Sequence, residues 1–177
     1  MAVLEKIFSF FAPVQTRIEP EIIVPAPLTT YEICPLTEKQ LKEVLKLNLR
    51  CFKEGENYTK HTFSYLLNEP NCLSYQLVKP NGQMIGFIFV IVEHGTGHIT
   101  TVGIAPEHRR RGLAQRMLNH AEKALQTRNI NTVMLEVRVG NLAAQNLYRE
   151  LGFSIVQRLL KYYNNGEDGF MMVKSLF

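Results

Sequence analysis

The run MIGFIFVIV, residues 84–92, places the strongest constraint on how this chain can fold. Apart from one glycine it is entirely apolar, and turn signals bound it on both sides: PNGQ at 80–83 and EHGTG at 93–97. The run is too short to cross a membrane, which takes about 20 residues. It therefore predicts the buried central strand of an antiparallel meander, with CLSYQLVK (72–79) and HITTVGIA (98–105) as its other strands.

Helix-like and strand-like patterns alternate through the rest of the chain. A helix is expected to follow Thr37, because Gln40 completes a capping box, and Gly152 suits the position just after a helix. The further elements expected are a strand at 29–36, helices at 37–51, 59–68, 112–128 and 141–151, and strands at 132–139, 153–163 and 169–177. This order predicts an α/β domain with a mixed, mostly antiparallel sheet and flanking helices.

The composition is that of a globular chain, with 46% hydrophobic and 20% charged residues. We expect one domain at 29–177, preceded by an extension and linker at 1–28 that is rich in proline. Four apolar residues of the extension share one face of a helix at residues 1–12: Leu4, Ile7, Phe8 and Phe11. That face suits either an ordered cap on the domain or docking to a partner or a membrane surface.

The cysteines and the net charge limit the compartment and the partners. Cys34, Cys51 and Cys72 are odd in number and fit neither a CxxC nor a zinc spacing, so we expect reduced thiols, a cytoplasmic location and no metal site. No apolar run is long enough for a transmembrane helix. A net charge of +4 suits an anionic small ligand but is too small to indicate nucleic-acid binding.

The segment IAPEHRRRGLAQRML, residues 104–118, places three arginines and a glycine where a helix begins. Backbone N–H groups at a helix N-terminus bind phosphate, and Gly112 would let the backbone approach an anion closely. A phosphate cradle, a solvated first turn and a nucleic-acid patch are three interpretations. The last is the weakest, because the arginines lack flanking aromatic residues and a second basic stripe.

The segment VGIAPEHRRRGLAQRML resembles motif A of the GCN5-related N-acetyltransferases (GNAT), with Arg109, Gly112 and Ala114 on its signature positions. LEVRVGNLAAQNLYRELGF and KYYNNGED are similar to segments of the bacterial ribosomal-protein alanine N-acetyltransferases and their N-terminal acetyltransferase relatives. The resemblance covers the chain from about residue 30 onward. It implies a GNAT fold whose fourth and fifth strands splay apart at a β-bulge, with acetyl-CoA in the gap and with Arg110 and Arg111 bordering its phosphates.

The resemblance also implies which residues hold acetyl-CoA. Its pantetheine arm would pair with the backbone of residues 102–104, and the N–H of Ile104 would meet the developing oxyanion. Its pyrophosphate would bind the amides of residues 110–115. Asn141 and Tyr148 would also contact the cofactor, and their separation by two helical turns puts them on one face. The full implied set is Val102, Gly103, Ile104, Arg109, Arg110, Arg111, Gly112, Leu113, Ala114, Gln115, Asn141 and Tyr148.

Glu136 is the candidate general base and Tyr148 the candidate general acid. In TVMLEVRV, alternate residues face opposite sides of the sheet, which places Glu136 and Arg138 opposite the more apolar set. Glu136 could act as a base beside the splay or could simply pair with Arg138. Tyr148 could protonate the leaving thiolate or could simply pack a helix on the sheet. The family resemblance favours catalysis in both cases.

Two segments would flank the entrance for a peptide, one between the first two helices and one in the last hairpin. The candidate substrate contacts are Phe52, Tyr58, Tyr162, Tyr163 and Glu167. The hairpin tyrosines could hydrogen-bond the peptide backbone, while Glu167 could attract a protonated N-terminus or a basic protein.

Taken with the resemblance, the sequence predicts an acetyl-CoA-dependent N-acetyltransferase that acts on the N-terminal α-amino group of a protein, with ribosomal proteins as candidate substrates. An α-amino group has a pKa near ~8 and is partly neutral at neutral pH, whereas lysine, near ~10.4, is almost wholly charged. A modest base therefore suffices for an N-terminal substrate. Two alternatives stay open: acetylation of lysine or a small-molecule amine, and a non-catalytic acyl-CoA-binding module.

Overall fold

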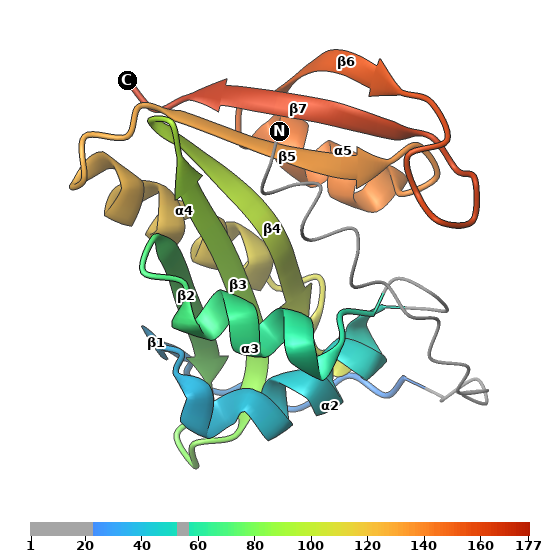
Figure 1. Ribbon diagram of the computed structural model, residues 1–177. Coiled ribbons are helices and arrows are strands. Elements are labelled where there is room, and N and C mark those ends of the chain that lie inside the picture. The colour runs from blue at the N-terminus through green and yellow to red at the C-terminus, as the bar shows by residue number, and fades with distance from the viewer. Residues whose placement is uncertain (1–22, 53–56) are drawn as a thin grey trace.

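A seven-stranded sheet in the order β1-β2-β3-β4-β5-β7-β6 forms the centre of the protein (Figure 1). The computed structural model describes residues 23–52 and 57–177, so the segment 1–12, expected to be either a cap or a docking helix, lies outside the described residues. The strands are β1 (Glu32–Pro35), β2 (Cys72–Val78), β3 (Met84–Glu93), β4 (Thr96–Ile104), β5 (Thr132–Arg138), β6 (Ser154–Leu159) and β7 (Gly169–Ser175). The helices are η1 (Glu38–Gln40), α2 (Leu41–Cys51), α3 (Lys60–Asn68), η2 (Pro106–His108), α4 (Leu113–Gln126) and α5 (Leu142–Glu150). The mixed, mostly antiparallel α/β architecture is as predicted.

The antiparallel meander β2–β3–β4 is confirmed, but its second turn is shorter than the predicted 93–97. The chain reverses at His94 and Gly95, whose φ angles are 48° and 76°. A tight two-residue hairpin needs positive φ at both central positions, so both strands extend up to the turn. His98 therefore lies inside β4 rather than at its start.

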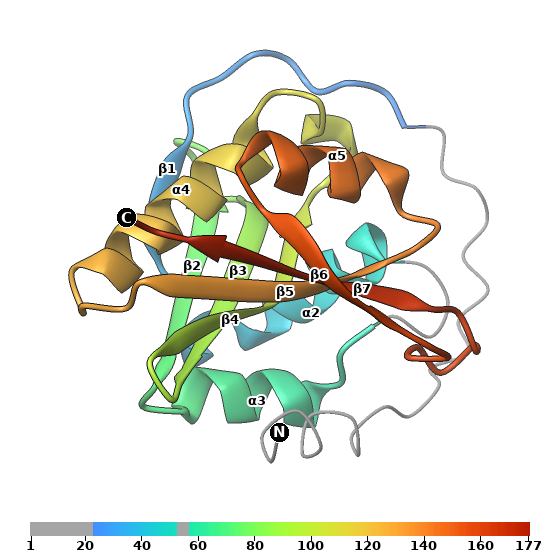
Figure 2. The same cartoon turned by 90° about the horizontal axis from the view of Figure 1, so that it is seen from above.

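Helices cover both faces of the sheet: α2 and α3 lie on one side, α4 and α5 on the other (Figure 2). The predicted helix at 37–51 starts as a single 3-10 turn before becoming α2, and the Gln40 side chain accepts a hydrogen bond from the Thr37 N–H at 3.1 Å, as in a capping box. Thr59 caps α3 by accepting from the N–H of Thr62 at 3.2 Å.

The core fills the space between the sheet and both helical layers. On one face, the Phe63 ring of α3 packs against Phe87 and Phe89 of β3, with centroids 5.8 and 5.3 Å apart. On the other, the buried stripe of α4 includes Met117 and Leu125, as its apolar spacing predicts. A Cβ at Gly97 would lie 2.6 Å from Leu125, so glycine there lets α4 approach the backbone of β4.

A crossover through α4 brings β5 parallel to β4, and the last hairpin then completes the sheet. Val133, Leu135 and Val137 of β5 are buried, and Glu136 points to the opposite face, as predicted. The strand predicted at 153–163 ends earlier, at Leu159. Lys161 takes a φ of 49° and donates its N–H to Asp168 at 2.8 Å, which starts a loop over residues 160–168, the hairpin loop.

Residues 23–31 form neither helix nor strand and contact η2. Ala26 donates its N–H to the carbonyl of Glu107 at 3.0 Å, and Arg111 donates to the carbonyls of Ala26 and Pro27 and to the hydroxyl of Tyr31. These bonds hold the end of the predicted linker against the domain. In the part of the chain that the structure describes, no helix has the length and apolar character that crossing a membrane requires.

Candidate active site

The two central strands separate to open a cleft. β4 and β5 pair in parallel over Thr96–His98 and Thr132–Met134 and then diverge (Figure 1). Across from β3, Phe89 faces Thr101 and Val90 faces Ile99, so Thr100 forms a β-bulge. The Tyr58 hydroxyl donates to the Thr100 carbonyl at 3.0 Å, which bonds the backbone of the bulge to the start of α3. The structure thus contains the splay and the bulge that the resemblance implies.

The backbone amides of β4 alternate between β3 and the cleft. Ala105 donates to the Ile85 carbonyl at 2.8 Å, and in an antiparallel pair only every second residue bonds to the same neighbour. The N–H groups of Val102 and Ile104 consequently face the cleft, while that of Gly103 faces β3. Glycine at position 103 has a packing reason, because a Cβ there would lie 2.8 Å from the Phe87 ring.

A concave set of amides lies where the cleft meets the start of α4. Gly112 caps the helix with φ 69° and Arg110 has φ 62°, a left-handed conformation that is uncommon for a residue other than glycine. The first intrahelical bond runs from the N–H of Arg116 to the Gly112 carbonyl, which leaves the N–H groups of residues 113–115 outside the helix's own bonding. The first turn has neither a side-chain cap nor an acidic residue, so amides and helix dipole are available to an anion.

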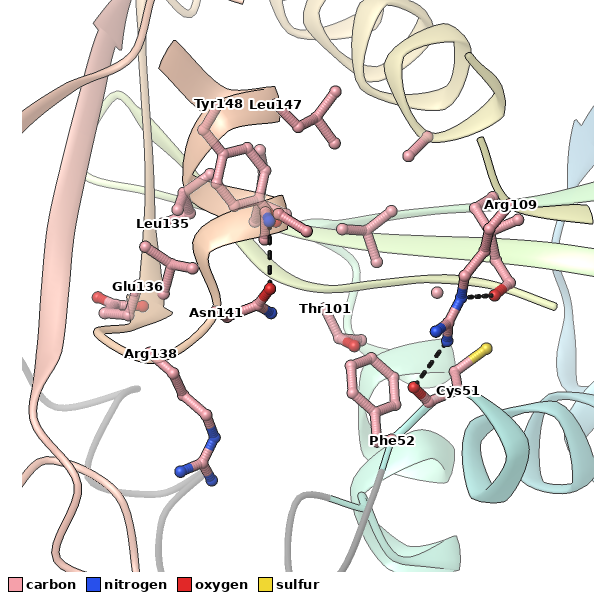
Figure 3. Close-up of a pocket in the computed structure, with 18 of the residues that line it drawn as sticks. Cys51, Phe52, Thr101, Arg109, Leu135, Glu136, Arg138, Asn141, Leu147 and Tyr148 are labelled. Carbon is pink, nitrogen blue, oxygen red and sulfur yellow. Dashed lines mark hydrogen bonds between the residues drawn. The ribbon is translucent and has the colours of Figure 1, made fainter. Parts of the chain in front are cut away.

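The side chains of the three arginines make different contacts. Arg109 donates through Nε to the Ile104 carbonyl at 3.0 Å and through Nη2 to the Cys51 carbonyl at 2.9 Å, joining the end of α2 to the end of β4 (Figure 3). Arg111 turns outward to the 26–31 segment. Arg110 is exposed and lines the cleft. Of the two arginines expected to border phosphates, Arg110 lines the cleft and Arg111 does not.

Asn141 and Tyr148 lie on the cleft face of α5, as their spacing predicts. Asn141 caps the helix by accepting from the Ala144 N–H at 3.1 Å (Figure 3). The Tyr148 side chain is buried, packs on Phe153 with ring centroids 5.8 Å apart and lines the cleft. Burial raises the pKa of Tyr148 to about 12, so its phenol is protonated at neutral pH.

Glu136 and His98 form a buried pair at the splay. Nε2 of His98 lies 2.6 Å from Oε2 of Glu136, and the side chains are 13% and 8% exposed. A carboxylate oxygen accepts, so the imidazole donates. The other oxygen, Oε1 of Glu136, is buried and has no hydrogen-bond partner among the described residues. The interpretation in which Glu136 pairs with Arg138 is wrong, because the Arg138 guanidinium bonds to Glu167 instead.

Aromatic residues surround the far end of the cleft. Phe52 follows α2 and packs against Phe87, and the Tyr162 and Tyr163 rings meet edge to face with centroids 5.1 Å apart. Burial is the main cause that raises the pKa values of Tyr58, Tyr162 and Tyr163, so these phenols stay protonated.

Glu167 lies beside the cleft without lining it. Its Oε1 accepts from the Gly140 N–H at 2.8 Å and its Oε2 accepts from Nη1 of Arg138 at 2.8 Å. The bond from Gly140, followed by that from Arg138, lowers the pKa of Glu167.

One cavity of about 790 Å³ brings these elements together. The predicted residues that line it are Val102, Gly103, Ile104, Arg109, Arg110, Gly112, Leu113, Ala114, Gln115, Glu136, Asn141, Tyr148, Phe52, Tyr58, Tyr162 and Tyr163. Arg111 and Glu167 lie outside it. A cleft that runs from the amides of β4 to a helix N-terminus without a side-chain cap suits an elongated ligand with a phosphate end.

Residues 41–153 match the acetyltransferase (GNAT) family, which is more than half of the chain. The chain belongs to this family. It is 37% identical over 144 residues to the N-alpha-acetyltransferase daf-31 of Caenorhabditis elegans, covering 77% of this chain and 78% of that protein.

Solved structures agree with the family assignment. The crystal structure of the ribosomal-protein-S18-alanine N-acetyltransferase from Escherichia coli superposes with a TM-score of 0.76 and 28% identity, covering 83% of this chain and 94% of that chain. The crystal structure of the NatC complex bound to Gag peptide and CoA gives a TM-score of 0.74 and 28% identity, covering 83% of this chain and 99% of that chain. The chain is thus a GNAT acyltransferase that uses acetyl-CoA.

The residues of the cleft fit acetyl-CoA. The N–H group of Val102 can pair with an amide carbonyl of a pantetheine arm, which leaves that of Ile104 for the thioester oxygen. The left-handed turn at Arg110 and Gly112 and the free amides of the first turn of α4 could bind a pyrophosphate. These roles, like the others that the resemblance implies, are proposals about this chain.

Local sequence patterns assign no role in the site to His98, and they suggest Arg138 only as a partner for Glu136. His98 pairs with Glu136, 38 residues away, and their meeting depends on the parallel register of β4 and β5. A period-two pattern could have assigned His98 a face of the strand, but no local signal fixes a register between strands that are joined by a long crossover.

Proposed function

We propose that this GNAT enzyme transfers the acetyl group of acetyl-CoA to the α-amino group at the N-terminus of a protein. The observation that carries the proposal is Oε1 of Glu136, which is buried beside His98 in the cleft between β4 and β5 and has no partner among the residues that the structure describes. A buried carboxylate oxygen without a partner is costly unless a ligand or water bonds to it. An amine that enters the cleft supplies such a partner.

The chemistry of the amine favours an N-terminus over lysine. With a pKa of about 8, an α-amino group needs to lose its proton only partly before it attacks at neutral pH, while lysine, at about 10.4, needs much stronger assistance. A single carboxylate held by one imidazole supplies modest assistance of this kind. The names of the relatives, N-alpha-acetyltransferases among them, support the same substrate class.

The side chains of the cleft then have distinct roles. Acetyl-CoA supplies a thioester carbon for the amine to attack and a thiolate that leaves. Glu136 accepts the proton that the amine loses as the N–C bond forms, and His98 holds the carboxylate in place. The N–H group of Ile104 can donate to the carbonyl oxygen as negative charge develops on it. Tyr148 donates its phenolic proton in a hydrogen bond to the departing sulfur.

Mass spectrometry of acetylated peptides tests the proposal. The peptides carry different first residues and one internal lysine, and each is compared with the same peptide blocked at its N-terminus. We expect acetylation of the free α-amino group and none of the blocked peptides. Acetylation of lysine in the blocked peptides, or of spermidine in preference to all peptides, would contradict the proposed substrate.

A substitution tests the role of Glu136 separately. Glu136→Gln keeps the shape but cannot accept a proton, so we expect kcat to fall about 100-fold and its pH profile to shift. Binding of acetyl-CoA, measured by titration calorimetry, should be unchanged. Glu43→Gln on the exposed face of α2 is the matched control. Wild-type kcat in Glu136→Gln would remove this carboxylate from the reaction.

Ribosomal proteins are the proposed class of physiological substrate, supported by the 28% identity to the Escherichia coli enzyme that acts on S18. Peptides with ribosomal N-termini belong in the same library, and a preference for other sequences would overturn this part. We further propose a cytoplasmic location, which the unpaired thiols of Cys34, Cys51 and Cys72 support. Imaging of the tagged full-length chain tests it.

A further inference from the structure

The Glu167 carboxylate connects the hairpin loop to the turn between β5 and α5. Oε1 accepts from the N–H of Gly140, and Oε2 accepts from Nη1 of Arg138, both at 2.8 Å. Asn165, in the same loop, adds a second acceptor for Arg138 Nη1 at 3.0 Å. Each oxygen of the carboxylate is therefore bonded within the protein, and its charge is balanced by a guanidinium whose side chain is only 13% exposed.

Arg138 links the Glu167 carboxylate to the tyrosines of the cleft. Its guanidinium carbon lies 3.8 Å from the centre of the Tyr163 ring, within the range of a cation–π contact. The Tyr163 ring in turn packs edge to face against Tyr162. Both rings line the cleft, whereas Glu167 does not. The chain of contacts thus runs from Glu167 through Arg138 to the two rings.

Gly140 is shaped for this contact. A Cβ at position 140 would lie 2.9 Å from Oε1 of Glu167, closer than side-chain atoms normally approach. Its φ is not among the positive values, so what glycine provides here is space for the carboxylate, which would have to shift to accommodate a Cβ. A substitution at residue 140 therefore displaces the carboxylate without removing its charge.

We propose that Glu167 is a positioning residue, which fixes Tyr162 and Tyr163 at the peptide entrance through Arg138 and does not itself attract the amino group of the substrate. This revises the role expected from sequence, in which the carboxylate recruits a protonated N-terminus. A recruiting carboxylate needs an oxygen that is open to the ligand, and here both accept bonds from the protein. The proposal rests on the proposed function, because it takes the peptide to enter between these tyrosines.

Three variants separate positioning from attraction by charge. Glu167→Gln removes the charge, Glu167→Asp keeps the charge but shortens the reach, and Gly140→Ala keeps Glu167 but blocks its approach. If Glu167 positions the tyrosines, all three raise KM for the peptide by about tenfold and leave KM for acetyl-CoA unchanged. The peptide KM of the Gly140→Ala/Glu167→Gln double variant should then be no higher than that of the more impaired single variant.

Attraction by charge predicts a different pattern. Glu167→Asp and Gly140→Ala would then bind peptide as the wild type does, and the effect of Glu167→Gln would vanish between about 50 and about 300 mM salt. That result would overturn the proposal. Positioning instead predicts an effect of Glu167→Gln that salt does not remove. Thermal denaturation of each variant identifies any that fails to fold, and Glu167→Asp still decides the question if Gly140→Ala does not fold.

Hydrogen–deuterium exchange tests, independently of activity, whether the bonds of Glu167 fix the hairpin loop. We expect faster exchange across residues 160–168 in Glu167→Gln than in the wild type, with α3 unchanged as an internal reference. Unchanged exchange in the hairpin loop would overturn the proposal. If the wild type acetylates no peptide, the proposed function fails, while the exchange result still decides whether Glu167 fixes the loop.

Discussion

Replacing Tyr148 with phenylalanine tests how the leaving thiolate is stabilised. The raised pKa, about 12, keeps the phenol protonated, but it also makes the phenol a weak acid. A thiol has a pKa of about 8.5, so complete transfer of the proton from the phenol to the thiolate is unfavourable by about 5 kcal/mol. We therefore expect Tyr148 to act through a hydrogen bond to the sulfur rather than by full protonation.

The size of the effect follows from that assignment. A hydrogen bond to a charged group contributes about 1.5–3 kcal/mol, which corresponds to a loss of about 10- to 150-fold in kcat for Tyr148→Phe. The phenyl ring keeps the packing on Phe153, so KM for acetyl-CoA should change little. Because burial raises the pKa of Tyr148, its ionisation should not reduce wild-type activity until the pH exceeds about 11.

The assay is steady-state release of the CoA thiol with an accepted peptide, from roughly pH 6 to 9. Tyr75→Phe is the matched control, since Tyr75 lies on β2 against His120 and away from the cleft. Two results would refute the reasoning. One is a kcat within about twofold of wild type in Tyr148→Phe. The other is an alkaline fall in wild-type activity near pH 9 that disappears in this variant.

Three further predictions concern the amides at the start of α4, the end of α2 and the hairpin loop. In Gly112→Ala the new Cβ meets no atom within 4 Å, but the residue must hold a φ of 69°. We therefore expect the free energy of unfolding to fall by about 1 kcal/mol and Tm by about 2–4 °C, with weaker acetyl-CoA binding in calorimetry. An unchanged Tm would argue against a required left-handed turn. Arg109→Gln loses the bonds to the carbonyls of Ile104 and Cys51, so we expect the KM for the peptide to rise by a larger factor than the Kd for acetyl-CoA. A change in the Kd for acetyl-CoA alone would contradict this prediction. Because the pKa of Glu167 is lowered, its bonds stabilise the fold above the ordinary carboxyl pKa of 4.5, and this stabilisation is lost as the pH falls through the lower folded value. Tm should therefore drop on acidification below about pH 4.5, and less steeply in Glu167→Gln. Measuring Tm of both proteins across this acid range checks the prediction.

Local patterns determined most of the architecture. The apolar run of β3 and its flanking turns defined the meander, and Asn141 marked the start of α5. The glycine at the start of α4 identified the amide cradle, where the structure shows the left-handed backbone that suits glycine. Each of these features depends on residues within a few positions of one another, so the sequence carries them directly.

Tertiary structure decided how the side chains of the site are paired. Arg109 and Arg111 are near neighbours in the chain, yet one joins β4 to α2 and the other bonds to Tyr31, 80 residues away. His98 meets Glu136 because β4 and β5 pair in one parallel register before they diverge. Such partners come from segments that no local propensity relates, and only the packing of helices on the splayed sheet brings them within hydrogen-bonding distance.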